Sequence, residues 1–283
     1  MCALSIVACG SGESTSARPT PEPASQKDFD PNRFSRSTVI DNRFYPLAAG
    51  MQFVYRGRAD RGGGPLSHRV IFTVTDLTKD VDDVRTVVMW DRDINGGRLL
   101  EAEITFFAQD DDGNVWNLGE YPEEYDARGR FDGAPSTWLS GRANAKAGIL
   151  MRADPRPGTS TYVQGTARDI GFGDEARVSS IGGERDCVPA GCYDDVMVID
   201  ETNPLEPGDG HQLKYFAPGL GNYRVAPGRG GTEREVLELL RVRMLGAGEL
   251  AQVRRDALRL DRRAYRTKPE IWMGTAPARR SPR

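Results

Sequence analysis

The fold is decided by a stretch that reads Asp82-Asp-Val-Arg-Thr-Val-Val-Met89 and continues through Ile104-Thr-Phe-Phe-Ala108 to a turn at Gly113-Asn114. Short apolar runs rich in Val, Phe and Thr, separated by Asp, Gly and Asn, are typical of strands joined by tight turns. The stretch therefore predicts an antiparallel meander. It belongs to a longer unit, about residues 44–120, that begins with a strand-like Phe53-Val-Tyr55.

The same landmarks return in the same order in the second half of the chain. They are Asp194-Asp-Val-Met-Val-Ile199, Leu213-Lys-Tyr-Phe-Ala217 and Gly221-Asn222. Tyr55 lies 58 positions before Gly113, and Tyr162 lies 59 positions before Gly221. We therefore predict a duplication, with halves at about residues 44–120 and 154–226. Segments 53–56 and 104–108 should superpose on segments 161–164 and 213–217.

Two such meanders predict a mainly β fold at residues 41–231, either a curved antiparallel sheet closed as a barrel or a sandwich. Charged and apolar residues alternate from Thr232 to Met244, which indicates a final strand. From Glu249 to Tyr265 apolar residues recur at helical spacing between arginines, which predicts an amphipathic helix. Its basic face indicates either a solvated surface or a patch that docks on anionic lipid or polymer. Residues 232–283 should thus form the strand, the helix and, after Trp272, a loose tail.

The first nine residues end in Ile6-Val-Ala-Cys9 and are followed by a polar segment. This order resembles the lipobox of bacterial lipoproteins, which implies that Cys9 becomes a lipid-modified N-terminus. The apolar part is short and no basic residue precedes it, so residues 1–9 read as a truncated signal. Residues 10–40 are expected to be a disordered tether. The protein should then be exported and anchored to the cell membrane, facing outside the cytoplasm; the alternative is a chance cysteine in a short apolar leader.

Two further cysteines, in Cys187-Val-Pro-Ala-Gly-Cys192, flank a Pro-Ala-Gly turn. Their spacing allows a disulfide across a hairpin, and an exported protein meets oxidising conditions. A zinc site is the weaker interpretation, because no second cysteine pair or histidine lies close by in the sequence.

Candidate catalytic and metal-binding residues are few. Asp110, Asp111 and Asp112 precede Gly113 and form a weak metal site candidate, but their spacing fails the EF-hand pattern, and a hairpin tip explains them better. Glu101 and Glu103 would share one face of a strand with Thr105, where paired carboxylates could support glycosidic acid–base chemistry. The only histidines, His68 and His211, are expected to be strand residues near loops rather than catalytic bases. No Gly-x-Ser-x-Gly or Ser-x-x-Lys pattern occurs.

Composition narrows the possible partners. The net charge of −3 does not favour a nucleic-acid partner, and no phosphate-binding loop or dinucleotide fingerprint is present, so no cofactor is expected. Aromatic residues are concentrated in the repeated halves. A curved sheet with a helix on one face can enclose an apolar cavity, and we expect a hydrophobic ligand site, if one forms, at the junction of the two halves.

Three segments carry a family resemblance. They are Phe107-Ala-Gln-Asp-Asp-Asp-Gly-Asn-Val-Trp-Asn-Leu-Gly-Glu120, Pro204-Leu-Glu-Pro207 and Tyr215-Phe-Ala-Pro-Gly-Leu-Gly221. They resemble exported bacterial proteins and lipoproteins of undefined function, over roughly residues 44–225. The resemblance implies a family but no catalytic residues. The sequence thus predicts a membrane-tethered, non-enzymatic protein that binds an amphipathic ligand, an envelope component or a partner protein. The alternatives are a secreted carboxylate-dependent hydrolase and a structural subunit of a surface complex.

Overall fold

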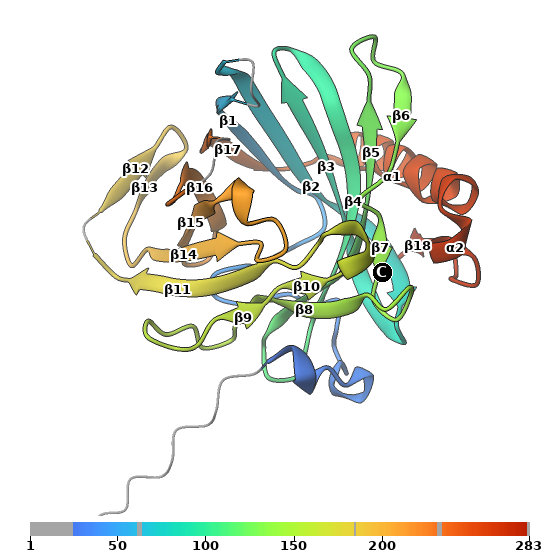
Figure 1. Ribbon diagram of the computed structural model, residues 1–283, viewed down its shortest axis with the longest axis horizontal. Coiled ribbons are helices and arrows are strands. Elements are labelled where there is room, and N and C mark those ends of the chain that lie inside the picture. Colours follow the sequence, from blue (N-terminus) through green and yellow to red (C-terminus); the bar gives the residue numbers. More distant parts are fainter. Residues whose placement is uncertain (1–24, 61–63, 184, 231–233, 282–283) are drawn as a thin grey trace, which may run out of the picture.

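The computed structural model describes residues 25–60, 64–183, 185–230 and 234–281. Its main element is an antiparallel sheet in the order β10-β8-β5-β4-β3-β2-β1-β17-β16-β15-β14-β11-β9 (Figure 1). In this order β8 spans Lys146–Met151, β10 spans Gly165–Thr166 and β17 spans Arg234–Met244. The first half of the chain supplies β1 (Met51–Asp60), β2 (Leu66–Val81), β3 (Val84–Asn95), β4 (Arg98–Gln109) and β5 (Val115–Tyr125). The second half supplies β9 (Tyr162–Val163), β11 (Glu175–Ile181), β14 (Met197–Thr202), β15 (His211–Ala217) and β16 (Gly221–Pro227).

The turn chemistry of the sequence explains the hairpins of the first half. Asp82 and Asp83 connect β2 to β3 with φ of 49° and 62°, and Gly96 and Gly97 connect β3 to β4 with φ of 58° and 78°. Two consecutive residues with positive φ form the tight turn whose twist matches that of the flanking strands, and Asp and Gly tolerate this conformation. The predicted antiparallel meander is confirmed.

The sheet curves until its ends nearly meet, which makes it barrel-like. On one side β17 (Arg234–Met244) pairs with both β1 and β16 and so joins the two halves. On the other side β8 (Lys146–Met151) pairs with β5 and β10 (Gly165–Thr166), while β9, just before β10 in the chain, pairs with β11. Gly148 allows this closure, because a Cβ there would lie 2.2 Å from the backbone nitrogen of Gly165.

The strand order of the two halves agrees. Each half contains a series of five antiparallel strands, β1-β2-β3-β4-β5 and β9-β11-β14-β15-β16, in which each strand pairs with the next. The short β10, between β9 and β11 in the chain, pairs with β8 instead. Segments 53–56 and 161–164 fall on the first strands of the two series, and segments 104–108 and 213–217 fall on the fourth. The second series has shorter strands and an inserted hairpin of β12 (Asp186–Val188) and β13 (Gly191–Tyr193). Superposition of the two halves stays a prediction.

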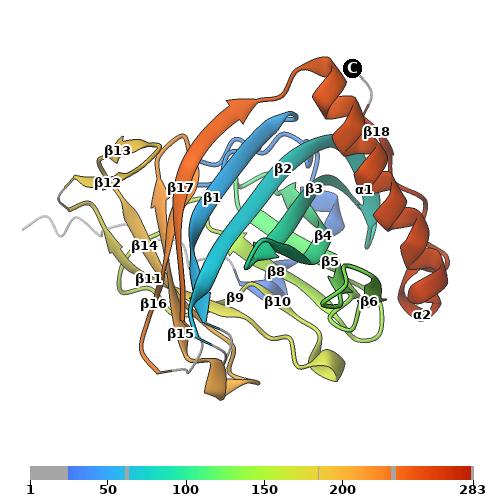
Figure 2. The ribbon, with the colours of Figure 1, turned by 90° about the horizontal axis from the view of Figure 1, so that it is seen from above.

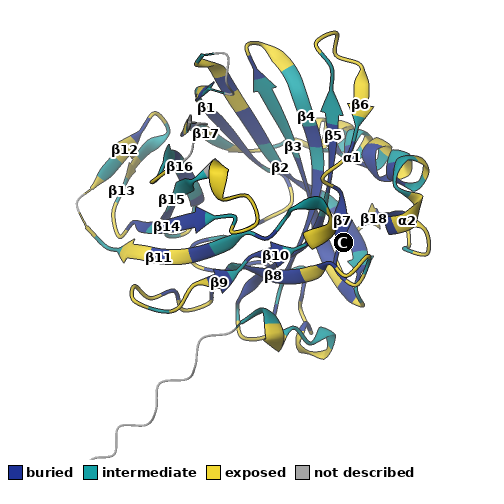
Figure 3. Ribbon diagram, viewed as in Figure 1, coloured by how far each residue is buried: buried dark blue, intermediate teal, exposed yellow. Residues whose placement is uncertain are grey.

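Helix α1 (Ala247–Thr267) packs on the outer face of the sheet, against β2, β4 and β5 (Figure 2). Its contact face consists of Val253, Ala257, Leu260, Asp261 and Ala264, all buried. The expected final strand and amphipathic helix thus both form. Figure 3 shows buried residues along β2–β5 and β8, whereas β6 (Phe131–Gly133) and much of β11 are exposed. Among the described residues, no helix combines the length and apolar character needed to cross a bilayer.

The expectation of a disordered tether over residues 10–40 is wrong for residues 25–40. These residues form the 3-10 turns η1 (Gln26–Asp28) and η2 (Pro31–Arg33) and lie against the sheet. Phe29 and Phe34 pack on Trp116, with ring centroids 5.4 and 6.1 Å away. The two phenylalanines give this polar segment enough apolar surface to bury, and composition alone hides that. Residues 10–24, like Cys9, lie outside the described residues.

The expectation of a loose tail after Trp272 is also wrong for the residues described. The chain forms α2 (Pro269–Trp272) and then β18 (Arg279–Arg280), which pairs with β2. Trp272 is fully buried between Phe106 and Tyr121, with ring centroids 5.9 and 5.3 Å away. One large aromatic side chain therefore anchors a segment whose Pro and Arg content is typical of a disordered tail.

Candidate functional site: an acidic and aromatic cavity inside the sheet

Strand alternation divides β4 into two faces with different chemistry. Phe106 points toward α2, as its contact with Trp272 shows. Glu101, Glu103 and Thr105 therefore point the other way, into the interior of the barrel-like sheet. The hydroxyl of Thr105 donates a hydrogen bond of 3.1 Å to Oε1 of Glu103, so the predicted shared face of these three residues is confirmed.

The neighbouring strands add carboxylates to this inner face. In the sheet register, Asp91 and Asp93 of β3 lie opposite Glu103 and Glu101, and Glu120 of β5 lies opposite Thr105. Carboxylate oxygens of Asp91, Glu101 and Glu103 all lie within 4.8 Å of one another. We call these three residues, together with Glu120, the acidic cluster.

Two residues of the acidic cluster differ in their hydrogen bonding. Oε1 of Glu120 accepts a hydrogen bond of 2.9 Å from the indole nitrogen of Trp138, on β7 (Trp138–Leu139). Oδ1 of Asp91 is buried and has no hydrogen-bond partner among the described residues. A buried acceptor atom without a donor costs free energy. The Asp91 carboxylate as a whole is nonetheless engaged, by a backbone hydrogen bond from Glu103.

Burial and mutual repulsion favour protonated carboxyls in the acidic cluster. Burial raises the pKa of Asp91 well above its ordinary value, and the charges of Glu101 and Asp93 raise it further. The pKa of Glu103 is likewise raised by burial and by Asp91 and Glu120. For Glu120, burial outweighs the bond from Trp138 and raises the pKa to about 7. The cluster therefore retains protons at a pH where surface carboxyls have lost them.

A cavity of about 230 Å³ opens beside the acidic cluster. Its apolar wall includes Tyr45, Tyr55, Phe72, Phe216, Val225 and Leu237. Its polar wall includes Asp91, Asp93, Glu101, Glu201, Lys214 and Glu235. Because these residues come from both halves of the chain and from β17, the cavity exists only in the closed sheet. It has the amphipathic character expected of a ligand site at the junction of the halves.

Among the described residues, Lys214 in the cavity wall and His68 beside it are both engaged by acids. Lys214 forms an ion pair with Glu201; burial alone would lower the pKa of Lys214, but Glu201 reverses the effect and the pKa is raised. His68 is fully buried, with Nε2 2.7 Å from Glu235 and Nδ1 3.3 Å from Asp93.

Sequence reasoning identified only part of this site. The sequence pattern predicts the pair Glu101 and Glu103, but it does not predict that Asp91, Glu120 and Glu201 lie near them. The alternation Asp91-Arg-Asp93 resembles that of Glu101-Ala-Glu103 and was an available signal. The alternation does not show the register of β3 and β4, which places the two pairs of carboxylates opposite each other.

The candidate metal residues Asp110, Asp111 and Asp112 lie at the β4–β5 hairpin tip and are engaged by protein donors. Asp110 accepts hydrogen bonds from the backbone of Asn114 and the indole of Trp116, both at 2.8 Å. Asp111 accepts from Ser35 at 2.6 Å, and Asp112 pairs with Arg33. These contacts fasten the N-terminal segment to the tip, which is a structural role, and the three residues do not join the acidic cluster.

The histidines do not meet. His68 lies in β2 and faces the interior, whereas Nδ1 of His211, at the start of β15, lies 2.7 Å from Oδ1 of Asp200. Oδ2 of Asp200 accepts a hydrogen bond from Arg177. Asp200 precedes the inward-facing Glu201 and therefore points outward, so His211 belongs to a surface network rather than to the cavity.

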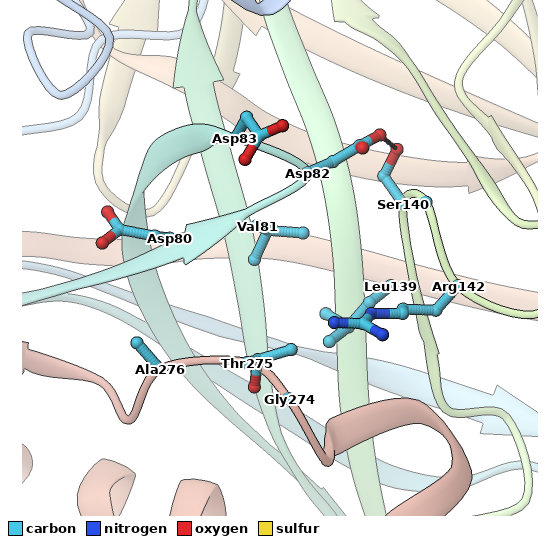
Figure 4. Close-up of a pocket in the computed structure, with 11 residues that line it drawn as sticks. Asp80, Val81, Asp82, Asp83, Leu139, Ser140, Arg142, Gly274, Thr275 and Ala276 are labelled. Atoms are coloured by element: carbon cyan, nitrogen blue, oxygen red, sulfur yellow. Dashed lines mark hydrogen bonds between the residues drawn. The ribbon is translucent and has the colours of Figure 1, made fainter.

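A second cavity, of about 320 Å³, lies on the outside between the β2–β3 turn, the loop after β7 and the C-terminal segment (Figure 4). Ser140 donates a hydrogen bond of 2.6 Å to Asp82 within it. None of the residues that line this cavity is a histidine or lysine that could activate the serine hydroxyl. The bond instead holds the turn to the loop.

The predicted disulfide between Cys187 and Cys192 is confirmed. The two residues are paired across the β12–β13 hairpin, with Cα atoms 4.0 Å apart.

Comparisons with known proteins give little further information. No protein-family model matches the chain, and no curated protein matches its sequence. Among solved structures, it is similar to a presumed exported protein with a YmcC-like fold from Bacteroides fragilis, with a TM-score of 0.37 and 14% identity over 71% of this chain and 99% of the other. It is also similar to a presumed lipoprotein from Parabacteroides distasonis, with a TM-score of 0.37 and 11% identity over 72% of this chain and 100% of the other. Similarity at this level carries no argument about function or location.

Proposed function

We propose that the protein is a membrane-tethered extracytoplasmic lipoprotein that binds a small amphipathic ligand inside its barrel-like sheet and catalyses no reaction. The observation that carries the binding role is the cavity, in which an apolar wall faces an acidic wall. Ligand sites characteristically combine a largely apolar surface with a few convergent polar groups. The tether rests on the lipobox that ends at Cys9 and on the polar segment after it.

A carboxylate-dependent hydrolase is the second candidate, favoured by the inward-facing carboxyls with raised pKa values. The size of the cavity argues against it. Pockets that bury a drug-sized ligand typically measure about 300–1,000 Å³, and a glycosidase must hold a sugar and its leaving group together. At about 230 Å³ the cavity is small for that task. Release of p-nitrophenol from a panel of aryl glycosides, abolished by Glu103→Gln, would establish the hydrolase instead.

Binding inside the sheet can be tested by filling the cavity. Val225 lines it, so Val225→Phe should project a ring into the space. Val236 on β17 is 42% exposed, and Val236→Phe is the matched control. We expect amphipathic compounds that raise the melting temperature of the native protein to leave Val225→Phe unaffected and to act normally on Val236→Phe. Equal responses of the two variants would place binding elsewhere.

The anchor is tested separately. In a bacterial host, a gene extended at its N-terminus with a complete lipoprotein signal should yield protein labelled by radioactive palmitate. Cys9→Ala should abolish the label and release the protein from the membrane fraction. Unlabelled protein from the extended gene would exclude the tether without bearing on the cavity.

A further inference from the structure

Three arginines lie on the outer face of the sheet: Arg56 on β1, Arg69 on β2 and Arg92 on β3. Each is the neighbour in sequence of a residue that lines the interior cavity, and these neighbours are Tyr55, Val70 and Asp91. Because successive side chains of a strand point to opposite faces, all three arginines point outward. Figure 2 shows β1, β2 and β3 next to one another, with α1 on their outer side.

The strand register brings the three arginine side chains together. Arg56 lies directly opposite Arg69. Arg69 in turn lies opposite Ile94, which makes Arg92, two residues earlier, its diagonal neighbour. Cβ atoms are about 4.5–5.5 Å apart in opposite pairs and about 7–8 Å apart on the diagonal, within reach of long side chains. Like charges placed directly opposite each other destabilise a sheet, so an anion between them would stabilise this arrangement.

These arginines lack the acidic partners that other arginines of the sheet and helix have. Arg56 and Arg69 are exposed, and among the described residues the side chains of Arg56, Arg69 and Arg92 form no hydrogen bond and no ion pair. Glu238 lies opposite Arg56 on β17, but it is engaged by Arg224, 3.4 Å away. The positive charge of the group is therefore available to a ligand.

Arg92 is the fixed member of the group. It is half-buried, and its guanidinium carbon lies 4.4 Å from the centroid of the Trp90 ring. Its Nε is buried and has no hydrogen-bond partner among the described residues. Burial lowers the pKa of Arg92 and the charge of Arg69 lowers it further, while Asp256 and Asp91 offset this only in part. Asp256 already pairs with an arginine of its own helix at 3.2 Å.

A phosphate group matches three adjacent guanidinium groups better than a carboxylate does. A phosphate monoester carries a charge of about −1.5 to −2 at pH 7 and three strong acceptor oxygens. A carboxylate carries a single charge and two oxygens. The planar fork of a guanidinium fits the spacing of phosphate oxygens, so each arginine can donate to a different edge of the same group.

We infer that Arg56, Arg69 and Arg92 form a binding site for the phosphate group of a phosphate monoester, which we call the arginine site. It lies on the opposite face of the sheet from the interior cavity and goes beyond the proposed function. A soluble phosphate ester and the headgroup of phosphatidic acid present the same chemical group, and the experiment distinguishes these two sources.

The test begins with isothermal titration of the full-length chain carrying Cys9→Ala, which excludes lipid modification. The probes are glycerol 3-phosphate, glycerate and glycerol, which present a phosphate, a carboxylate and no charged group. Glycerol 3-phosphate should bind at least tenfold more tightly than glycerate, because it makes more charge-assisted hydrogen bonds. Glycerol should not bind. Sodium chloride should weaken the binding of glycerol 3-phosphate, since the site is open to solvent.

Paired variants separate the arginine site from net charge. Arg69→Gln/Arg92→Gln should weaken glycerol 3-phosphate binding at least tenfold. Arg56→Gln/Arg69→Gln should do the same, and it will fold because both side chains are exposed and form no bond that the substitution removes. Arg128→Gln/Arg168→Gln is the matched control, since it removes the same charge from exposed positions elsewhere. Its affinity should equal that of the native arginines.

Cosedimentation with vesicles identifies the source of the phosphate. Vesicles of phosphatidylcholine alone are compared with vesicles that also contain phosphatidic acid. Binding to the second kind that disappears in Arg69→Gln/Arg92→Gln supports the site and assigns it to a lipid headgroup. Binding of glycerol 3-phosphate without binding to either vesicle supports the site and assigns it to a soluble ester.

Three results would overturn the inference. Glycerate that binds as tightly as glycerol 3-phosphate would exclude specificity for phosphate. Equal weakening in Arg69→Gln/Arg92→Gln and Arg128→Gln/Arg168→Gln would show an effect of net charge alone. Absence of binding to both glycerol 3-phosphate and phosphatidic acid would exclude the site. None of these results bears on the interior cavity, because Val225→Phe should leave phosphate binding unchanged.

Discussion

Nζ of Lys79 lies 3.0 Å from Oδ1 of Asp261, and both side chains are almost completely buried between β2 and α1. The ammonium also donates to the backbone oxygen of Ala276 at 2.8 Å. Asp261 in turn accepts from the indole of Trp272 and the backbone nitrogen of Ala278, both at 3.0 Å. The pair therefore joins the sheet, the helix and the C-terminal segment in one hydrogen-bonded network, and every charge in it is compensated.

Lys79→Met should lower the free energy of unfolding by about 3–5 kcal/mol, because it leaves the carboxylate of Asp261 buried without its counter-ion. Urea denaturation followed by tryptophan fluorescence measures the change. Arg130→Ala is the control, since Arg130 is 68% exposed and pairs with Asp126 at the surface. That variant should change stability by no more than about 1 kcal/mol.

The double variant Lys79→Met/Asp261→Leu should recover part of this loss. It removes both charges, but it deprives the Trp272 indole and the Ala278 backbone of their acceptor, so recovery is incomplete. A single Lys79→Met variant as stable as Arg130→Ala would show that the buried pair contributes nothing.

Trp272→Ala should lower the free energy of unfolding by about 3–5 kcal/mol, the usual range for removing a large buried aromatic side chain. The side chain is 0% exposed and packs on Phe106 and Tyr121. Met273→Ala is the neighbouring control, because Met273 is 60% exposed. In thermal unfolding, Trp272→Ala should have a much lower melting temperature than Met273→Ala. Equal melting temperatures would mean that the C-terminal segment does not contribute to the core.

Stability should fall as the pH rises from about 4.5 to about 7, in part because of Glu120. Its pKa is raised by burial from 4.5 to about 7, so the folded protein binds a proton that the unfolded chain has lost in this interval. The stabilisation is complete below the unfolded value and is lost as the pH passes the folded value. The groups that face Glu120 are Glu103, Trp138, Asp174 and Lys214.

Glu120→Gln should therefore flatten part of this pH dependence and raise stability at pH 8 by on the order of 1 kcal/mol. The amide oxygen can still accept the hydrogen bond from Trp138. Urea midpoints measured from pH 4 to 9 test this expectation, with the exposed Glu270→Gln as control. A native profile that rises between pH 5 and 7, or a variant that loses stability at pH 8, would contradict the prediction.

Removing the disulfide should have a limited effect. Cys187 and Cys192 close a small loop in an exposed hairpin, for which loop entropy gives about 2 kcal/mol. Cys187→Ser/Cys192→Ser should therefore fold, and urea denaturation should show a free energy of unfolding lower by about 2 kcal/mol. Alkylation before and after reduction should find both thiols masked in the native protein. Failure of the serine variant to fold would assign the hairpin a larger role.

Local pattern was sufficient to predict much of the fold. Turn residues such as Asp82-Asp83 and the paired cysteines act over a few residues, so spacing identifies them. The alternation of residues 234–244 and the helical spacing of 249–265 likewise depend only on neighbours in the chain. The ordered segments 25–40 and 273–281 were missed because a few side chains, among them Phe34 and Trp272, outweigh an otherwise polar composition.

Local patterns in the amino-acid sequence are sufficient to predict the meander, the turns, the disulfide and the shared strand face of Glu101 and Glu103. Three features depend on tertiary contacts instead: this face points inward, Asp91 and Glu120 lie beside it, and Lys79 contacts Asp261. Alternation states which residues share a face, but sheet register and closure join strands that lie far apart in the chain. Burial and charge repulsion in the acidic cluster follow from that closure, so the chemistry of the cavity is a property of the assembled sheet.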